Sequence, residues 1–243
     1  MGFGDKFKGF WRRIWYGGPG WRKWLARSVI VLVAWPLLMT LVYAFVPVPI
    51  SNVMLLRLIT GNGLHKSWMS LDSISPDLPR AVIASEDQRF CSHHGIDWVE
   101  FEDAMDGSDE GPRRGASTIS MQVAKNLFLW DGRSFIRKGL EMPLAVYMDG
   151  IWSKHRMLEV YLNIVEWAPG VYGAEAAAQH HFHKSASALT RKEAALLAAV
   201  LPNPIKRDAG KPSGKVRQVA NRIQLRMSGI LPYLTCIQQN PKL

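Results

Sequence analysis

Residues 84–97 read ASEDQRFCSHHGID and follow directly on a short apolar run. In this stretch the adjacent carboxylates of Glu86 and Asp87 are followed, within nine residues, by a phenylalanine, two histidines and a glycine. Upstream, Ser75 and Pro76 predict a helix start, with Ser75 as the N-cap and Pro76 at the first helical position. About three turns of helix would then place Glu86 near the helix C-terminus.

Glu86 is a candidate general base in this setting. The negative end of the helix dipole and the neighbouring Asp87 both disfavour ionisation, so they raise the pKa of Glu86 toward neutrality. A carboxylate with such a pKa is suited to abstract a proton. The competing interpretation is a solvated acidic turn, which is the usual role of an isolated Glu–Asp pair at a helix end.

Charge and hydropathy predict a membrane anchor and argue against a nucleic-acid partner. The 243-residue chain carries a net charge of +10, but residues 1–27 alone hold seven basic side chains against one acidic side chain. Residues 28–46 follow without a single charge and would form about 28 Å of helix. Basic residues beside such a segment fit the positive-inside rule. An interfacial aromatic belt would be formed by Trp11, Trp15, Tyr16, Trp21 and Trp24.

The apolar segment is expected to remain in the mature protein, because no small-residue cleavage site of a signal peptide follows it. A buried core helix is the alternative. The predicted organisation is a cytoplasmic basic N-terminus at 1–27, a transmembrane helix at 28–46, a juxtamembrane connector at 47–67 and one folded domain at 68–243.

The two cysteines, Cys91 and Cys236, are 145 residues apart. An oxidising compartment would allow one disulfide. Nothing in the sequence indicates pairing across so long a separation, and we expect both to be free thiols. Neither has the Cys/His spacing of a metal site, so no metal-binding residues are predicted.

The folded domain is predicted to be mainly α. No alternating strand pattern and no internal repeat occurs. Residues 102–115 are polar and glycine-rich and predict a mobile loop. Helices are expected over 52–59, from Ser153, over 174–182, from the capping box at Thr190 and over 213–231.

A further helix, capped by Ser117 or Thr118, is predicted to have one apolar and one polar face. The apolar face contains Ile119, Val123, Leu127 and Trp130. The polar face contains side chains that can bind sugar or phosphate, namely Gln122, Lys125 and Asn126.

The next helix, from about Ser134, carries opposite charges one turn apart. Arg137 and Glu141 stand at i and i+4 and share a face. Taken alone, such a pair is most often a surface ion pair worth about 0.3–0.5 kcal/mol. Lys138 adds a second cation, and Pro143 is expected to kink or break the helix.

Five blocks of the chain resemble, in order and in spacing, the peptidoglycan glycosyltransferases of glycosyltransferase family 51, and most closely the monofunctional biosynthetic type. Each block is a weak signal alone, whereas five in order over about residues 68–204 are a strong one. The blocks are Glu86-Asp87-x-x-Phe90-x-x-His93-x-Gly95, Gly115-x-Ser117-Thr118-Ile119-x-x-Gln122-x-x-Lys125-Asn126, Arg137-Lys138-x-x-Glu141 running on to Ser153-Lys154 and Glu159-x-Tyr161-Leu162-Asn163, Glu166-Trp167 through Gly170, Gly173 and Ala176-Ala177, and Glu193-Ala194-Ala195-Leu196-Leu197-Ala198.

The resemblance implies a helical, lysozyme-like fold and the polymerisation of lipid II into glycan strands during bacterial cell-wall synthesis. It makes Glu86 the general base that takes a proton from the 4-hydroxyl of the acceptor. That oxygen attacks C1 of the donor sugar, undecaprenyl pyrophosphate leaves and the configuration inverts. Glu141 would be the second catalytic carboxylate, helping at the leaving group or orienting its partners.

The resemblance also implies residues that bind and support. A pyrophosphate leaving group requires positive charge, and an arginine can bind phosphate in bidentate fashion. The implied substrate- and pyrophosphate-binding residues are Ser117, Thr118, Gln122, Lys125, Asn126, Arg137 and Lys138. The implied supporting residues are Asp87, Phe90, His93 and Gly95. A structural histidine is the alternative for His93 and for His94, and simple packing is the alternative for Tyr161-Leu162-Asn163.

The implied partners are lipid II, the growing glycan chain, the membrane and proteins of cell-wall synthesis or division, with no nucleic acid. No tightly bound cofactor is expected, although Mg²⁺ or Mn²⁺ could assist the pyrophosphate. The implied location is the bacterial inner membrane, single-pass, with a cytoplasmic N-terminus and a periplasmic catalytic domain. A tethered enzyme there meets its membrane-held substrate at high effective concentration. Residues 53–59 and the loop at 102–115 could admit the lipid tail.

Three positions depart from the family pattern. Met121 stands where the family usually has a first glutamine before Gln122, and Asp149 stands where it usually has a glutamate. Pro143 is unusual within the third block. The Met121 and Pro143 departures leave open a non-catalytic, membrane-anchored scaffold of the cell-wall machinery. A lysozyme-like lytic enzyme that cleaves glycan stays open as well, because such an enzyme also uses an acidic glutamate.

Overall fold

The computed structural model describes residues 8–9, 20–105, 117–132 and 134–237. The chain divides into two compact units, Met1–Phe45 and Val46–Leu243. The predictions for Trp11, Trp15 and Tyr16, and for most of the loop at 102–115, lie outside the described residues.

The first unit contains α2, Gly20–Tyr43. Among the described residues, α2 is the one helix long and apolar enough to cross a membrane. It begins earlier than the predicted span at 28–46, because no glycine or proline interrupts the preceding turns, and it also ends earlier. Pro36 stays within the helix, and the Thr40 hydroxyl donates to the Pro36 carbonyl (2.8 Å).

The second unit consists largely of helices, which confirms the mainly-α prediction. Its α-helices are α3 (Asn52–Ile59), α4 (Asp77–Glu86), α5 (Trp98–Met105), α6 (Ile119–Phe128), α7 (Phe135–Ile151), α8 (Lys154–Ile164), α9 (Ala174–Phe182), α10 (Arg191–Val200) and α11 (Gly214–Gly229). Short 3₁₀ helices are η1 (Leu71–Ser73), η2 (Ala186–Ala188), η3 (Leu231–Tyr233) and η4 (Thr235–Ile237).

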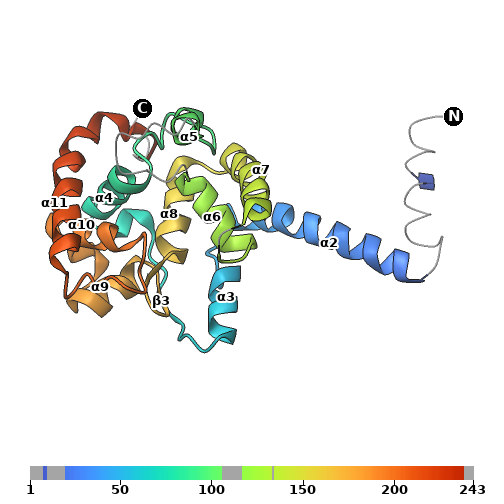
Figure 1. Cartoon of the computed structure of the whole chain (residues 1–243), viewed down its shortest axis with the longest axis horizontal. Coiled ribbons are helices and arrows are strands. Elements are labelled where there is room, and N and C mark those ends of the chain that lie inside the picture. Colours follow the sequence, from blue (N-terminus) through green and yellow to red (C-terminus); the bar gives the residue numbers. More distant parts are fainter. Residues whose placement is uncertain (1–7, 10–19, 106–116, 133, 238–243) are drawn as a thin grey trace. The chain divides into compact units, whose positions relative to one another are not determined.

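The helices of the second unit form two packed groups. α4 packs against α10 and α11, whereas α6 packs against α3, α7 and α8, as can be followed in Figure 1. Side chains that are fully buried between these helices include Leu78 and Ile83 of α4, Ile119 of α6, and Met157 and Leu158 of α8. The two groups meet at the C-terminus of α4, where Glu86 accepts a hydrogen bond from Gln122 of α6.

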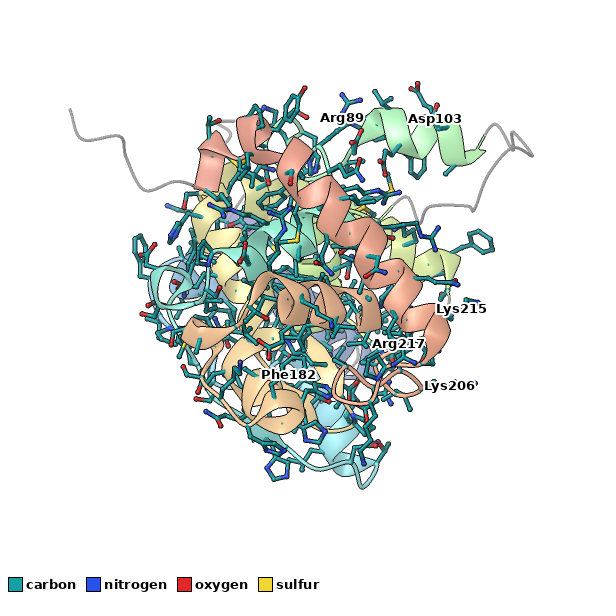
Figure 2. All side chains as sticks on the ribbon, turned by 90° about the vertical axis from the view of Figure 1, so that its left-hand side faces the viewer. Arg89, Asp103, Phe182, Lys206, Lys215 and Arg217 are labelled. Carbon is teal, nitrogen blue, oxygen red and sulfur yellow. A yellow bond between two sulfur atoms is a disulfide. The ribbon has the colours of Figure 1, made fainter. Side chains whose placement is uncertain are left out.

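α11 shows why an amphipathic pattern predicts a surface helix. Val216, Ala220 and Ile223 on one side of the helix are buried. Lys215 and Arg217 are exposed and can be followed on the outside of the unit in Figure 2. The hydrophobic effect therefore orients α11 with its basic residues in solvent.

A small sheet accompanies the helices, although the sequence shows no alternating strand pattern. Its strands are β1 (His65–Lys66), β2 (Glu166–Ala168) and β3 (Val171–Tyr172), in the order β1-β3-β2. β1 pairs with β3 in parallel and β2 pairs with β3 antiparallel. Strands of two or three residues are too short to display an alternating pattern, so pairing between distant segments defines them.

Four local expectations also need correction. α4 begins at Asp77 with Pro76 as its N-cap, one residue later than predicted. Residues 102–105, predicted as loop, belong to α5. α6 ends at Phe128, so the exposed Trp130 lies beyond the helix and not on its apolar face. α7 continues through Pro143, so the expected break does not occur there, whereas the kink stays a prediction.

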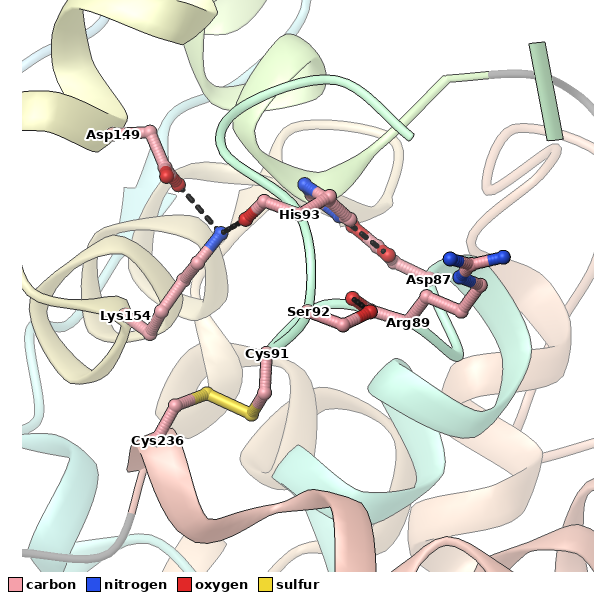
Figure 3. The surroundings of a disulfide bond; sticks show 8 residues. All are labelled: Asp87, Arg89, Cys91, Ser92, His93, Asp149, Lys154 and Cys236. Atoms are coloured by element: carbon pink, nitrogen blue, oxygen red, sulfur yellow. Dashed lines mark hydrogen bonds and ion pairs between the residues drawn. A yellow bond between two sulfur atoms is a disulfide. The ribbon is translucent and has the colours of Figure 1, made fainter. Parts of the chain in front are cut away.

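The cysteines form a disulfide, so the expectation of two free thiols is wrong. Cys91 and Cys236 have Cα atoms 5.5 Å apart. Figure 3 shows the bond joining the segment after α4 to η4, near the chain's C-terminal end. Tertiary packing alone brings these residues together, because 145 residues separate them in the chain.

Candidate active site

Glu86 is the last residue of α4 and its side chain is half-buried. The Gln122 side-chain amide of α6 donates to Glu86 Oε2 at 3.0 Å. Burial is the largest cause that raises the pKa of Glu86, and the charge of Asp87 is a smaller one. The predicted direction is confirmed, but desolvation dominates over the neighbouring charge. The Gln122 hydrogen bond and the positive charges of Arg207 and Lys125 act in the opposite direction.

The Asp87 carboxylate is buried and takes no part in the hydrogen bond between Gln122 and Glu86. Its two oxygens lie 2.9 and 3.0 Å from His93 Nε2, and Oδ2 also accepts from the Ile119 backbone amide at 2.9 Å. Asp87 and His93 are both buried. Asp87 thus connects the end of α4 to the first turn of α6. Its contact with His93 supports the alternative that His93 is a structural histidine. His94, by contrast, is 96% exposed.

Two further residues of the first block support this loop. Phe90 is fully buried, with its ring edge-on to His93 and the Lys154 ammonium 4.7 Å from the ring centroid. Gly95 has φ +83°, and a Cβ there would lie 2.8 Å from the Ala145 carbonyl carbon and oxygen. The close approach of α7 therefore requires a glycine at this position. Figure 3 shows how Asp87 and His93 lie in this loop.

The second carboxylate, Glu141, is 3% exposed and holds two cations. It forms ion pairs with Arg137 and, at 3.6 Å, with Lys138. Lys138 Nζ also donates to Ser117 Oγ at 2.6 Å. Burial of Glu141 excludes the exposed surface pair as an explanation, because an unpaired carboxylate in this position would be strongly destabilising.

Lys125 lies within the same field of positive charge. It is half-buried, and within the described part of the chain its ammonium has no hydrogen bond or ion pair. Burial lowers the pKa of Lys125, and the charges of Arg137 and Arg57 lower it further. Burial, Arg137 and Lys125 together lower the pKa of Lys138 to about 8. Three cations that repel one another in a half-buried position favour a polyanionic ligand.

A second polar cluster contains residues that sequence reasoning did not assign to the site. Arg57 of α3 lies 2.6 Å from Asp131 and 3.8 Å from Glu166. Glu166 accepts from the Gly170 amide at 3.0 Å and from the Tyr172 hydroxyl at 3.4 Å. Two signals could have indicated this cluster: Arg57 is the only charge in the octapeptide NVMLLRLI, and Glu166 opens the fourth block.

Some predicted binding residues are occupied elsewhere. Thr118 caps α6 by accepting from the Met121 amide, and its hydroxyl donates to the Gly95 carbonyl at 2.6 Å. Asn126 is buried and, among the described residues, forms no hydrogen bond with the cation cluster. For these two residues the packing contacts are established, and a substrate contact stays a prediction.

The three departures from the family pattern fit into the fold. Asp149 Oδ1 lies 2.7 Å from Lys154 Nζ and accepts from the Ser120 hydroxyl at 3.2 Å. Met121 is fully buried, with Lys138 Nζ 3.9 Å from its sulfur. α7 continues through Pro143, and Glu141 of the same helix forms its ion pairs with Arg137 and Lys138.

The described residues contain no group of three or more His, Cys, Asp or Glu side chains placed to hold a metal ion. What they hold is a carboxylate with a raised pKa next to a cluster of lysines and arginines. Such an arrangement can remove a proton from a hydroxyl while it stabilises an anionic leaving group. The class that combines these features on this helical fold is the transglycosylases, and the chain belongs to that family. The Transglycosylase family profile matches residues 53–228.

The relatives point to one kind of transglycosylase. The chain is 47% identical over 230 residues to the biosynthetic peptidoglycan transglycosylase of Rhizobium leguminosarum bv. trifolii, covering 94% of this chain and 99% of that protein. It is 48% identical to the protein of the same name from Agrobacterium fabrum, and the match covers 88% of this chain and 96% of that protein. The Nitrobacter hamburgensis protein of that name is 49% identical, and the match covers 82% of this chain and 88% of that protein.

Proposed function

We propose that the protein polymerises lipid II into peptidoglycan glycan strands, with Glu86 as general base. It is a transglycosylase of peptidoglycan biosynthesis. The observation that carries the assignment of Glu86 is its position: a half-buried carboxylate with a raised pKa, one hydrogen bond from Gln122, in the field of Lys125. A general base requires a pKa near the working pH, and burial supplies the shift.

The proposed step is a single displacement at the anomeric carbon. Glu86, as carboxylate, takes the proton of the acceptor's 4-hydroxyl, and the oxygen forms a bond to C1 of the donor sugar. The bond from C1 to the pyrophosphate oxygen breaks, and its electron pair leaves with undecaprenyl pyrophosphate. The configuration at C1 inverts from α to β. Glu86 then releases the proton to water before the next turnover.

The cation cluster serves the leaving group in this proposal. Lys125, with an ammonium that is free of partners among the described residues, contacts the pyrophosphate, and Lys138 and Arg137 add charge where its oxygens become more negative. Glu141 keeps Arg137 and Lys138 in place through its ion pairs. It is therefore a positioning carboxylate, and it does not itself donate a proton.

A divalent cation, Mg²⁺ or Mn²⁺, is proposed to enter only with the substrate's pyrophosphate, where it would neutralise phosphate charge. Phosphate-bound Mg²⁺ commonly uses few protein ligands. Polymerisation measured with and without a chelator, at fixed lipid II concentration, tests this point. Unchanged activity after chelation would exclude a role for the ion.

The membrane location belongs to the same proposal. α2 is long and apolar enough for an anchor, and the basic residues of 1–27 favour a cytoplasmic N-terminus. The catalytic unit would then lie in the periplasm, attached to the bacterial inner membrane that holds lipid II. Alkaline phosphatase fused after residue 243 should be active in cells. A stable but inactive fusion would contradict this orientation.

Glu86→Gln is the decisive variant for the mechanism. We expect polymerisation of purified lipid II to fall by about two orders of magnitude or more, because a general base contributes roughly 10²–10⁴-fold. Asp77→Asn, which neutralises a carboxylate at the other end of α4, is the matched control and should leave activity near wild type. A Glu86→Gln enzyme as active as wild type would refute the mechanism.

The same assay separates the two competing functions. A lytic enzyme would consume preformed glycan and make no polymer from lipid II. A non-catalytic scaffold would do neither, in the wild-type protein as well as in the variant. Polymer formation that depends on Glu86 excludes both.

A further inference from the structure

A chain of two hydrogen bonds connects three helices at Glu86. Tyr161 of α8 donates from its hydroxyl to Gln122 Oε1 at 3.1 Å, and Gln122 Nε2 of α6 donates to Glu86 Oε2 at 3.0 Å. Tyr161 is fully buried, and within the described residues Gln122 is its hydroxyl's hydrogen-bond partner. The phenol therefore reaches the catalytic carboxylate only through the amide.

The direction of these bonds follows from the chemistry of the groups. A carboxylate only accepts hydrogen bonds, so it requires the NH₂ side of the Gln122 amide. The opposite side of the amide is then a carbonyl, which requires a donor, and the Tyr161 hydroxyl supplies it. Burial and the charges of Glu86 and Asp87 raise the pKa of Tyr161 well above its ordinary value, so the phenol keeps its proton.

We infer that Tyr161 is a positioning residue of the transfer reaction: its buried hydroxyl fixes the orientation of the Gln122 amide, which in turn holds the Glu86 carboxylate by one oxygen. The other oxygen, Oε1, is left to accept the proton of the incoming hydroxyl. This inference rests on the proposed function, since it takes Glu86 as the base. It assigns a role to a residue that the sequence places only within a packing motif.

The electrostatic setting of Glu86 shows what the orientation controls. Asp87, the C-cap of α4, disfavours the charged form, whereas Lys125 of α6 and Arg207, in the segment between α10 and α11, favour it. Tyr161 of α8 is neutral. The Gln122 hydrogen bond is the second-largest influence after burial, and it lowers the pKa of Glu86. An amide free to turn would present its carbonyl to the carboxylate for part of the time, and this lowering would weaken.

Tyr161→Phe tests the inference, because it removes one oxygen and keeps the buried ring. We expect kcat/KM for lipid II to fall about tenfold, the scale of one charge-assisted hydrogen bond. We also expect the acidic limb of the kcat/KM profile to move to higher pH, by up to about one unit. Tyr233→Phe, at an exposed position outside the site, is the control and should change neither.

A second background separates positioning from packing. Gln122→Met removes the amide at similar length, and in that background Tyr161→Phe should have little further effect on kcat/KM. If Tyr161→Phe lowers kcat/KM equally in both backgrounds, or if the acidic limb does not move, Tyr161 only packs and the inference is overturned. Thermal unfolding of each variant, run in parallel, reports any loss of folded protein.

Failure of this inference can be told from failure of the proposed function. Glu86→Gln is measured in the same series. If the Glu86→Gln enzyme is active, Glu86 is not the base, and the proposed function and the role of Tyr161 both fail. An inactive Glu86→Gln enzyme combined with a Tyr161→Phe enzyme that matches wild type in rate and pH profile overturns the role of Tyr161 alone.

Discussion

The Cys91–Cys236 disulfide allows a stability prediction whose magnitude follows from the loop that it closes. We expect the double variant Cys91→Ala/Cys236→Ala to be markedly less stable than the oxidised protein. The disulfide closes a loop of 145 residues. In the chain-entropy description, removing that closure raises the entropy of the unfolded chain, which corresponds to about 5 kcal/mol at 25 °C for this loop length.

The expected loss of unfolding free energy lies between about 2 and 5 kcal/mol, because reduced chains retain some structure and long loops deliver less than the entropy formula gives. With a urea m-value of about 2 kcal/mol/M, the midpoint should move down by roughly 1–2.5 M. The detergent-solubilised full chain, followed by far-UV circular dichroism, is suitable for this measurement.

Two controls make the test specific. Each single variant should lose as much stability as the double variant, because either substitution breaks the same bond. A reductant should lower the midpoint of the wild-type protein and leave that of the double variant unchanged. Equal midpoints for oxidised wild type and double variant would refute the reasoning, as would the titration of two free thiols in the unreduced protein.

Two further predictions follow from the site. Gly95→Ala should destabilise the fold by about 1–3 kcal/mol, because φ is +83° and the new Cβ would meet the Ala145 backbone. The control is Gly150→Ala in α7, where nothing lies within 4 Å of the new Cβ, and it should leave the unfolding midpoint unchanged. KM for lipid II should rise as pH increases through about 8, because the Lys138 ammonium loses its proton there, and Lys138→Arg should flatten this rise. An unfolding midpoint of Gly95→Ala equal to that of wild type would contradict the first prediction. A rise of KM above about pH 8 that persists in Lys138→Arg would contradict the second.

The sequence predicted the helices well because their signals are local. Ser153, Thr190 and Ser213 each cap the helix that follows, and the apolar spacing of 52–59 gives α3 its bounds. Capping and periodicity act within one or two turns, so they can be read without knowledge of the fold. The pairing of Arg137 with Glu141, one turn apart, was predictable for the same reason.

The contacts that sequence reasoning missed join distant segments. Arg57 meets Asp131 and Glu166 only after α3 packs against α6 and the β2–β3 hairpin forms. The largest cause of the raised Glu86 pKa is burial, which is a property of the packed structure, whereas the smaller effect of Asp87 follows from its place beside Glu86 in the sequence. Likewise, α7 continues through Pro143, although proline disfavours the interior of a helix.

By itself, the sequence determined the apolar anchor segment, the mainly helical domain and the residue types of a base beside a cation cluster. Only the tertiary structure decided which of these groups touch. It turned Asp87 toward His93, aligned Tyr161 and Gln122 on Glu86, and joined Cys91 to Cys236. The physical reason is range: propensity and periodicity act over a few residues, whereas burial and long-range contacts exist only once the whole chain has folded.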